Sequence, residues 1–270
     1  ETALEEEGLA LAHPAEAAYD DFDFEADLRR VLARLAERSA PREVRLVLCL
    51  DELDALATYP PASREQLRAL VQALEPAVRM VAAGVLAVER EALRTSPFYN
   101  QFTRVALRAL SRKEAERLIR QPAGDLYRFT DAAVDFIVAR SHGLPLAAQR
   151  LCHHAVNVML DQDAREIDRP RAELAFRRAL ADRTPEFQLT WWGGQDKETG
   201  LPLPPLNAAQ RRILQEVLVN DDLLQRRAYE GEGAVFTRRQ LYNLTYESPE
   251  GLRLTALFAT WMRENVLHEI

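Results

Sequence analysis

The sequence predicts an α/β fold in its first part, followed by an all-helical region and a small C-terminal domain. Two short apolar runs, residues 44–50 and 78–85, alternate with segments of helical periodicity, which is the order of a parallel sheet covered by helices. From Ser111 onward the next segments show helical patterns only. A stretch rich in glycine and proline, residues 191–205, then separates residues 207–270 from the rest.

Composition bounds the class of protein. The chain has 270 residues, of which 47% are hydrophobic and 29% charged, a balance typical of soluble globular domains. Its net charge of −7 disfavours a general binder of nucleic acid or of anionic membranes. Charges interrupt every apolar run before the ~18 residues that a membrane span needs. We therefore expect no membrane partner.

The cysteines and the first residues predict a cytoplasmic location. Cys49 lies in an apolar run and Cys152 in a helical pattern, so both are predicted to be small buried thiols in a reducing compartment. Residues 1–9 are acidic and lack the basic and apolar regions of a secretory signal. The longer segment 1–20 is rich in alanine and glutamate, and we expect it to be a poorly ordered lead-in.

The first part of the chain is predicted to alternate helices and strands. A helix begins at Phe22, and a strand buried on both faces follows at residues 44–50. Ser63 is predicted to be the N-cap of the next helix, and residues 78–85 form a second strand. A third, brief strand is predicted at residues 105–107.

The middle of the chain is expected to be all-α. A capping box at residues 111–114 starts one helix, and Thr130 caps the next, which stops at residues 142–143. A third helix begins near Pro145, and residues 171–181 form a fourth.

Beyond these helices the character of the chain changes again. Residues 191–205 have the chemistry of a linker, and their two adjacent tryptophans are predicted to be a packing plug between domains. Asn207 caps a helix, residues 236–241 form a short capped helix, residues 252–258 form a strand or short helix, and residues 261–267 form a terminal helix. The C-terminal domain has eight arginines against nine acids, so its net charge of −1 gives no overall attraction for phosphate.

The strongest local signal for chemistry is the run from Leu46 to Glu52. An apolar strand ends in two adjacent carboxylates, Asp51 and Glu52, at the edge where ligands of open α/β sheets bind. The first carboxylate can hold Mg²⁺, usually through water, and the second can orient or deprotonate an attacking water. Such a pair suits a nucleotide hydrolase, and the alternative is that both residues begin a loop or cap the next helix.

This run resembles the Walker B motif, with its catalytic glutamate, of P-loop ATPases of the AAA+/STAND class. The resemblance assigns Asp51 to the metal and Glu52 to the water. Residues 96–102, followed by 105–115, look like the loop, last core strand and first lid helix of bacterial STAND-type ATPases. The sequence departs from these families at residues 82–84, where no polar sensor side chain follows the second strand.

A second part of the resemblance lies in residues 141–145. They are similar to the Gly-x-Pro turn of the STAND lid, where a helix starts facing the nucleotide. This implies nucleotide-binding roles for Gly143, Pro145 and, as a phosphate sensor, Arg150. Pro145 pre-sets φ at the first helical turn, and Gly143 permits a sharp bend. The alternative is an ordinary joint between two helices.

The resemblance covers roughly residues 22–185 and implies a partial parallel-sheet P-loop NTPase core, an all-α lid and a C-terminal winged-helix-like domain. The expected boundaries are a lead-in at 1–20, a core at 21–110, a lid at 111–185, a linker at 186–206 and a winged-helix-like domain at 207–270. In STAND proteins such a domain commonly packs on the ATPase core and holds the off state.

The phosphate-binding loop is missing from this sequence. That loop needs Gly-x-x-x-x-Gly-Lys-Ser/Thr, and neither Lys113 nor Lys197 follows such a glycine or precedes Ser or Thr. We therefore expect a fragment of a longer protein that supplies the N-terminal P-loop segment and an effector domain, rather than a natural relic. ATP and Mg²⁺ are the cofactors implied for the full-length ATPase, whereas this chain alone is expected to bind them weakly and to be inactive.

Three functions remain open on the sequence. The first is an ATP-dependent molecular switch in regulatory or defence signalling, with self-association as a possible further contact. The second is a DNA-linked AAA+ ATPase, an initiator or transposition regulator, which shares the Asp-Glu-x-Asp pattern of residues 51–54 and would bind DNA in a salt-dependent way. The third is a non-catalytic partner-binding module, in which Glu52→Gln changes nothing.

Overall fold

The computed structural model divides the chain into two compact units, Glu1–Arg104 and Val105–Ile270, and each is described by itself. The described residues are 21–40, 42–51, 60–84, 102–103, 105, 107–195, 200, 202–220, 222–229, 233–236, 241 and 244–267. The predicted lead-in at 1–20, Glu52 and most of the predicted loop at 96–102 lie outside the described residues.

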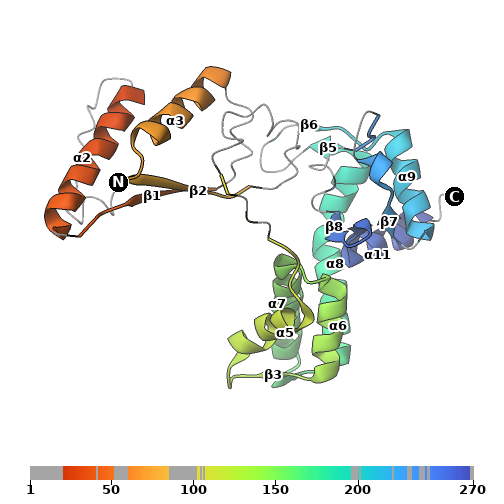
Figure 1. Ribbon diagram of the computed structural model, residues 1–270. Coiled ribbons are helices and arrows are strands. Elements are labelled where there is room, and N and C mark those ends of the chain that lie inside the picture. Colours follow the sequence, from red (N-terminus) through yellow and green to blue (C-terminus); the bar gives the residue numbers. More distant parts are fainter. Residues whose placement is uncertain are drawn as a thin grey trace. The chain divides into compact units, whose positions relative to one another are not determined.

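In the described residues of the first unit, two helices accompany a two-stranded parallel sheet (Figure 1). Its elements are α2 (Asp21–Ser39), β1 (Leu46–Leu50), α3 (Pro61–Ala73) and β2 (Val78–Ala82). Leu46 lies opposite Val78 and Leu50 opposite Ala82, so the predicted parallel pairing of the two apolar runs is confirmed. Helix α3 begins at Pro61 rather than after Ser63, because the fixed φ of proline suits the first helical position.

The two faces of this sheet differ in burial. Leu46, Leu48 and Val78 point to one face and pack with residues of both helices, including Leu28 of α2 and Leu70 of α3. On the other face Val47 is 51% exposed and Val81 is 60% exposed. The prediction of a strand buried on both faces is therefore wrong for the described residues, because α2 and α3 contact the same face. Cys49 shares the outer face and is exposed, not buried as predicted.

The segment that begins the second unit is not the predicted strand. Val105 and Leu107 belong to no strand, and Leu107 is 95% exposed. A few residues later the backbone N–H of Leu110 donates a hydrogen bond to the carbonyl of Gly143 at 2.7 Å. The backbone partner of this segment is thus a turn of the helical region.

The helical region follows the predicted caps closely. Its elements are α5 (Arg112–Arg120), the 3₁₀ helix η2 (Gln121–Ala123), β3 (Arg128–Phe129), α6 (Asp131–Ser141), α7 (Pro145–Asp161), β4 (Glu166–Ile167) and α8 (Arg169–Trp192). The Ser111 backbone N–H donates to the Glu114 carboxylate at 2.8 Å, and the Ser111 hydroxyl accepts from the Glu114 backbone N–H, which completes the predicted capping box. The Thr130 hydroxyl accepts from the Ala133 N–H at 3.2 Å, so this predicted cap is also confirmed.

Helix α8 is longer than predicted. It starts at Arg169 and continues through Pro185 to Trp192, so residues 186–192 are helix and not linker. A proline inside a helix costs about 3 kcal/mol. Phe187 and Trp191, which follow it, are almost fully buried, and aromatic side chains bury ~150–250 Å² each at ~25 cal/mol per Å². Burial of the two rings outweighs the cost of the proline.

The described residues of the C-terminal part of the second unit include a three-stranded antiparallel sheet, which one helix precedes and another follows in the sequence. The elements described there are β5 (Gly194–Gln195), β6 (Pro202–Leu203), α9 (Ala208–Val219), β7 (Leu223–Leu224), the 3₁₀ helix η3 (Arg226–Ala228), β8 (Thr245–Ser248), β9 (Gly251–Leu254) and α11 (Ala256–Asn265). Strands β5 and β6 pair with each other, and the larger sheet has the order β7–β9–β8. Most of the short helix predicted at 236–241 lies outside the described residues.

Aromatic rings join α8 to the core of this C-terminal part. The Trp261 ring stacks on Phe258 at 5.8 Å between ring centroids, and it lies 5.8 Å from Phe187 and 6.2 Å from Trp191. Trp191 is therefore buried where α8 meets this core, while Trp192 remains 42% exposed, and the plug between domains predicted for the pair stays a prediction. Because α8 also contributes Phe176 to the core of the helical region, one helix spans both cores.

None of the helices in the described part of the chain is both long enough and apolar enough to cross a lipid bilayer.

Candidate functional site

The predicted metal ligand lies where the first strand ends. Asp51 directly follows β1 and is exposed, and β2 ends at the same edge because the two strands are parallel. The Ala83 backbone N–H donates to the Leu50 carbonyl at 2.8 Å, which holds the two strand ends together. The described residues after β2, Ala83 and Gly84, bring no polar side chain to this edge. Its predicted partner Glu52 lies outside the described residues.

The predicted Gly-x-Pro turn lies between α6 and α7 in the second unit. His142 has a left-handed φ of 52° and Gly143 a φ of 72°, after which Pro145 occupies the first turn of α7. A Cβ atom on Gly143 would lie 2.4 Å from the Leu110 carbonyl oxygen, closer than real Cβ contacts. Only glycine suits this position, because it combines a left-handed φ with a close backbone approach.

One side-chain contact of the same turn was not predicted from the sequence. The His142 ring stacks on the Tyr246 ring of β8, with 4.1 Å between centroids and 8° between planes. His142 was predicted only as the end of a helix, and Tyr246 was not singled out. No local pattern predicts the pair, since the two residues lie far apart in the sequence. The contact ties the turn to the sheet of the C-terminal part.

The surroundings of His142 keep its ring neutral at pH 7. Burial lowers the pKa of His142 to about 4, with further lowering from the Arg140 and Arg253 charges, whereas Asp222 raises it. Asp222 is itself held by Arg263, whose guanidinium donates to both carboxylate oxygens at 2.8 and 2.9 Å. A neutral ring stacks on tyrosine without the desolvation cost of a buried cation.

Arg150 lies on α7, beyond the turn. It has no carboxylate partner among the described residues. The Arg150 charge lowers the pKa of Arg183, although burial of Arg183 is the larger cause. Arg183 in turn donates to Glu186 at 2.6 Å and stacks over Phe187 at 5.2 Å. The Arg150 charge therefore lies near Arg183 of α8.

The structure groups the predicted site residues by unit. Gly143 lies just before α7, Pro145 is its first residue and Arg150 lies in its second turn, whereas Asp51 belongs to the first unit. A carboxylate oxygen at the edge of a parallel sheet suits a hard cation such as Mg²⁺. A lone guanidinium suits a phosphate oxygen. ATP and Mg²⁺ therefore remain predictions for these residues.

Acidification is expected to destabilise the second unit through His142. Between pH 6.5 and 4 the unfolded chain binds a proton that the folded chain does not, so the free energy of unfolding falls as the pH is lowered. The loss is about 2 kcal/mol between pH 7 and 4.5, because one pKa unit is worth ~1.4 kcal/mol and the ring is partly solvated. His142→Asn, which tolerates the left-handed φ, should lose that much less stability over the same range in urea denaturation. Equal losses in both proteins would show that another group titrates.

Comparison with known proteins gives a distant structural likeness. No known protein family and no curated protein matches the chain. Its mixed α/β fold, with small parallel sheets and many helices, is similar to the Holliday junction branch migration motor RuvB of Thermotoga maritima, with a TM-score of 0.44 and 16% identity over 90% of this chain and 83% of that chain. A point mutant of RuvB gives a TM-score of 0.46 and 18% identity over 87% of this chain and 75% of that chain. This distant likeness identifies no activity, ligand or partner.

Proposed function

We propose that this chain is part of an ATP-dependent molecular switch of the STAND/AAA+ type, used in regulatory or defence signalling. The observation that carries the proposal is the double contact of one turn. Gly143 accepts a hydrogen bond from Leu110, which leads into the helical region, and His142 stacks on Tyr246 of the C-terminal sheet. A molecular switch needs an element whose equilibrium between two states can be shifted from two sites. This turn contacts the segment before α5 through Gly143 and the C-terminal sheet through His142.

The proposed roles of the carboxylates follow from their place in the first unit. Asp51 would hold Mg²⁺, usually through water, and Glu52 would orient or deprotonate the water that attacks the γ-phosphate. When bound, Mg²⁺ would neutralise developing charge on the phosphate oxygens. Arg150 would bind a phosphate group of the nucleotide. The presence or absence of that phosphate would then change the conformation of the preceding turn at residues 141–145. The P-loop that this chemistry requires would come from a segment upstream of this chain.

The C-terminal part is proposed to act as the winged-helix-like domain of the switch. Its strand order and flanking helices suit that fold, and α8 joins it firmly to the helical region through Phe187 and Trp191. The β8–β9 hairpin has exposed carboxylates at Glu247 and Glu250, and Arg253 donates to Glu250 at 2.8 Å. This charge favours packing against protein over binding to DNA phosphate at the hairpin.

The test of the proposal is Mg·ATP binding and turnover, measured for this chain and for a protein that includes its native upstream residues. We expect only the longer protein to bind, and Glu52→Gln to lower its turnover at least a hundredfold while ATP still binds. Glu65→Gln, which removes an exposed carboxylate on α3, should leave turnover unchanged. Failure of both proteins to bind ATP, or equal turnover in the two variants, would overturn the proposal.

A further inference from the structure

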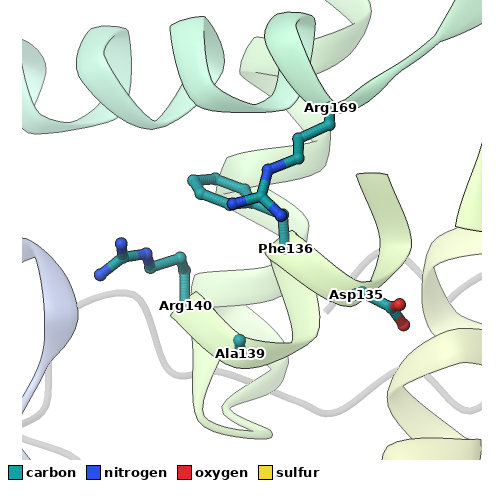
Figure 2. Close-up of a pocket in the computed structure, with 5 residues that line it drawn as sticks. All are labelled: Asp135, Phe136, Ala139, Arg140 and Arg169. Atoms are coloured by element: carbon teal, nitrogen blue, oxygen red, sulfur yellow. The ribbon is translucent and has the colours of Figure 1, made fainter. Parts of the chain in front are cut away.

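A hollow of about 260 Å³ lies on the surface of the helical region, along the last turns of α6 before the turn at 142–143 (Figure 2). It is formed by the outer face of α6 and the start of α8, and its lining residues are Asp135, Phe136, Ala139, Arg140 and Arg169. The roles proposed above for ATP use none of them. A shallow hollow with an aromatic floor and two cations needs an explanation of its own.

Two guanidinium groups converge on one aromatic ring in this hollow. The guanidinium carbon of Arg140 lies 5.4 Å from the centroid of the Phe136 ring, and that of Arg169 lies 5.8 Å from it. Figure 2 shows Arg140 on α6 and Arg169 on α8 on either side of Phe136. Arg140 also lies 5.3 Å from the ring of Phe176, which is buried. A guanidinium group that stacks on a ring can still donate N–H bonds from its edge, and the Nε–H of Arg169 already donates to Glu173.

The charges around the hollow are not balanced. Arg169 donates through Nε to Glu173 at 2.8 Å, and Asp135 pairs with Arg112. Arg140 has no carboxylate partner in the part of the chain that the structure describes. Three guanidinium groups against two carboxylates leave a net charge of +1. Two like charges on one ring repel each other, and a monoanion between them would relieve that repulsion.

We propose that this hollow is a binding site for a single glutamate or aspartate carboxylate of a protein partner. A planar carboxylate can accept two parallel N–H bonds from a guanidinium fork, and its charge of −1 balances the excess. The methylene stem of the ligand would lie on Phe136 and Ala139. A glutamate side chain has five heavy atoms, so at ~30 Å³ for each water-sized group it fits within the hollow.

The charges at the rim of the hollow favour a single carboxylate over a nucleic acid as the ligand. Asp135 and Glu173 place carboxylates beside the two arginines. A polyanion that tracks along the surface would meet this repulsion at each neighbouring phosphate and needs several basic contacts for useful affinity. One side-chain carboxylate meets the arginines without a neighbouring charge on the ligand.

The probe for this site is the peptide acetyl-Leu-Glu-Leu-amide, titrated into the ¹⁵N-labelled chain and followed by the NMR signals of the arginine Nε–Hε groups. We expect saturable shifts of the Arg140 and Arg169 signals. The matched peptide with glutamine in place of glutamate should shift them at least tenfold less. Arg140→Gln should weaken binding of the glutamate peptide about tenfold or more, because a charged hydrogen-bond partner is removed.

Two further variants separate binding from stability. Arg169→Gln removes the second cation without disturbing the contact of Arg140 with Phe176, and it should also weaken binding about tenfold. Arg212→Gln removes an exposed arginine of α9, paired with Glu216, and should bind like the wild type. Equal shifts with both peptides, or wild-type binding in both the Arg140 and Arg169 variants, would overturn the proposal. So would tighter, arginine-dependent binding of an eight-nucleotide oligothymidine, which would assign the site to phosphate.

Discussion

Replacing Gly143 by alanine is expected to destabilise the second unit by about 2–4 kcal/mol. A left-handed φ costs a residue with a Cβ about 1–2 kcal/mol. The new Cβ would lie 2.4 Å from the Leu110 carbonyl oxygen, so the backbone must move and the Leu110–Gly143 hydrogen bond weakens, at about 1 kcal/mol. Chemical denaturation followed by circular dichroism measures the loss.

The control for this prediction is Gly200→Ala. Gly200 has nearly the same φ, 69° against 72°, but a Cβ there would meet nothing within 4 Å. It should therefore show the backbone cost alone, about 1–2 kcal/mol. If the two variants lose equal stability, the close approach of Leu110 to the turn is not a constraint, and the turn does not link these segments.

Replacing Trp261 by alanine is expected to cost about 3–5 kcal/mol. Trp261 is fully buried and contacts Phe187 and Trp191 on α8 as well as Phe258 on α11. Its removal leaves a cavity where α8 joins the C-terminal part. The expected result is a lower urea midpoint and weaker protection of the end of α8 from hydrogen exchange.

Trp192→Ala is the matched control for that variant. Trp192 also lies against Trp261, at 5.6 Å between ring centroids, but it is 42% exposed. We expect a loss of about 1 kcal/mol or less, because solvent already covers much of the ring. A similar cost for both tryptophans would mean that the aromatic cluster is not the joint between α8 and the C-terminal sheet.

Local chemistry explains which elements the sequence predicted correctly. The capping box at Ser111, the cap at Thr130 and the proline at the start of α7 depend on residues within one helical turn. The parallel pairing of β1 and β2 followed from two short apolar runs separated by a helix. The interactions that produce these elements involve residues close together in the sequence, so the sequence predicts them.

The wrong predictions share a different cause, because long-range packing decided them. The glycines and prolines of residues 193–205 indicated a linker, yet burial of Phe187 against residues of α11 keeps α8 helical as far as Trp192. Cys49 was predicted to be buried because its run is apolar, but the described helices cover the opposite face of its sheet. The burial of a strand residue depends on which element packs against its face of the sheet. The sequence of the strand alone does not specify that element.

The candidate site shows the same division. The bend at Gly143 and the start of α7 at Pro145 could be predicted from residue type and spacing. The stack of His142 on Tyr246 could not, since it pairs a turn with a strand from a distant part of the sequence. The nucleotide-binding roles of Asp51, Glu52 and Arg150 remain predictions that binding and turnover will test.

The central claim is that the turn at residues 141–145 carries the nucleotide state to the C-terminal sheet. Hydrogen exchange, measured by mass spectrometry with and without Mg·ATP on the protein with its upstream residues, tests it most directly. We predict that ATP changes the protection of residues 141–145 and of β8 together, and that Asp51→Asn abolishes both changes. If ATP binds and changes the protection of residues 141–145 while the exchange of β8 is unchanged, the turn does not couple the nucleotide to the C-terminal sheet. The switch mechanism would then be wrong.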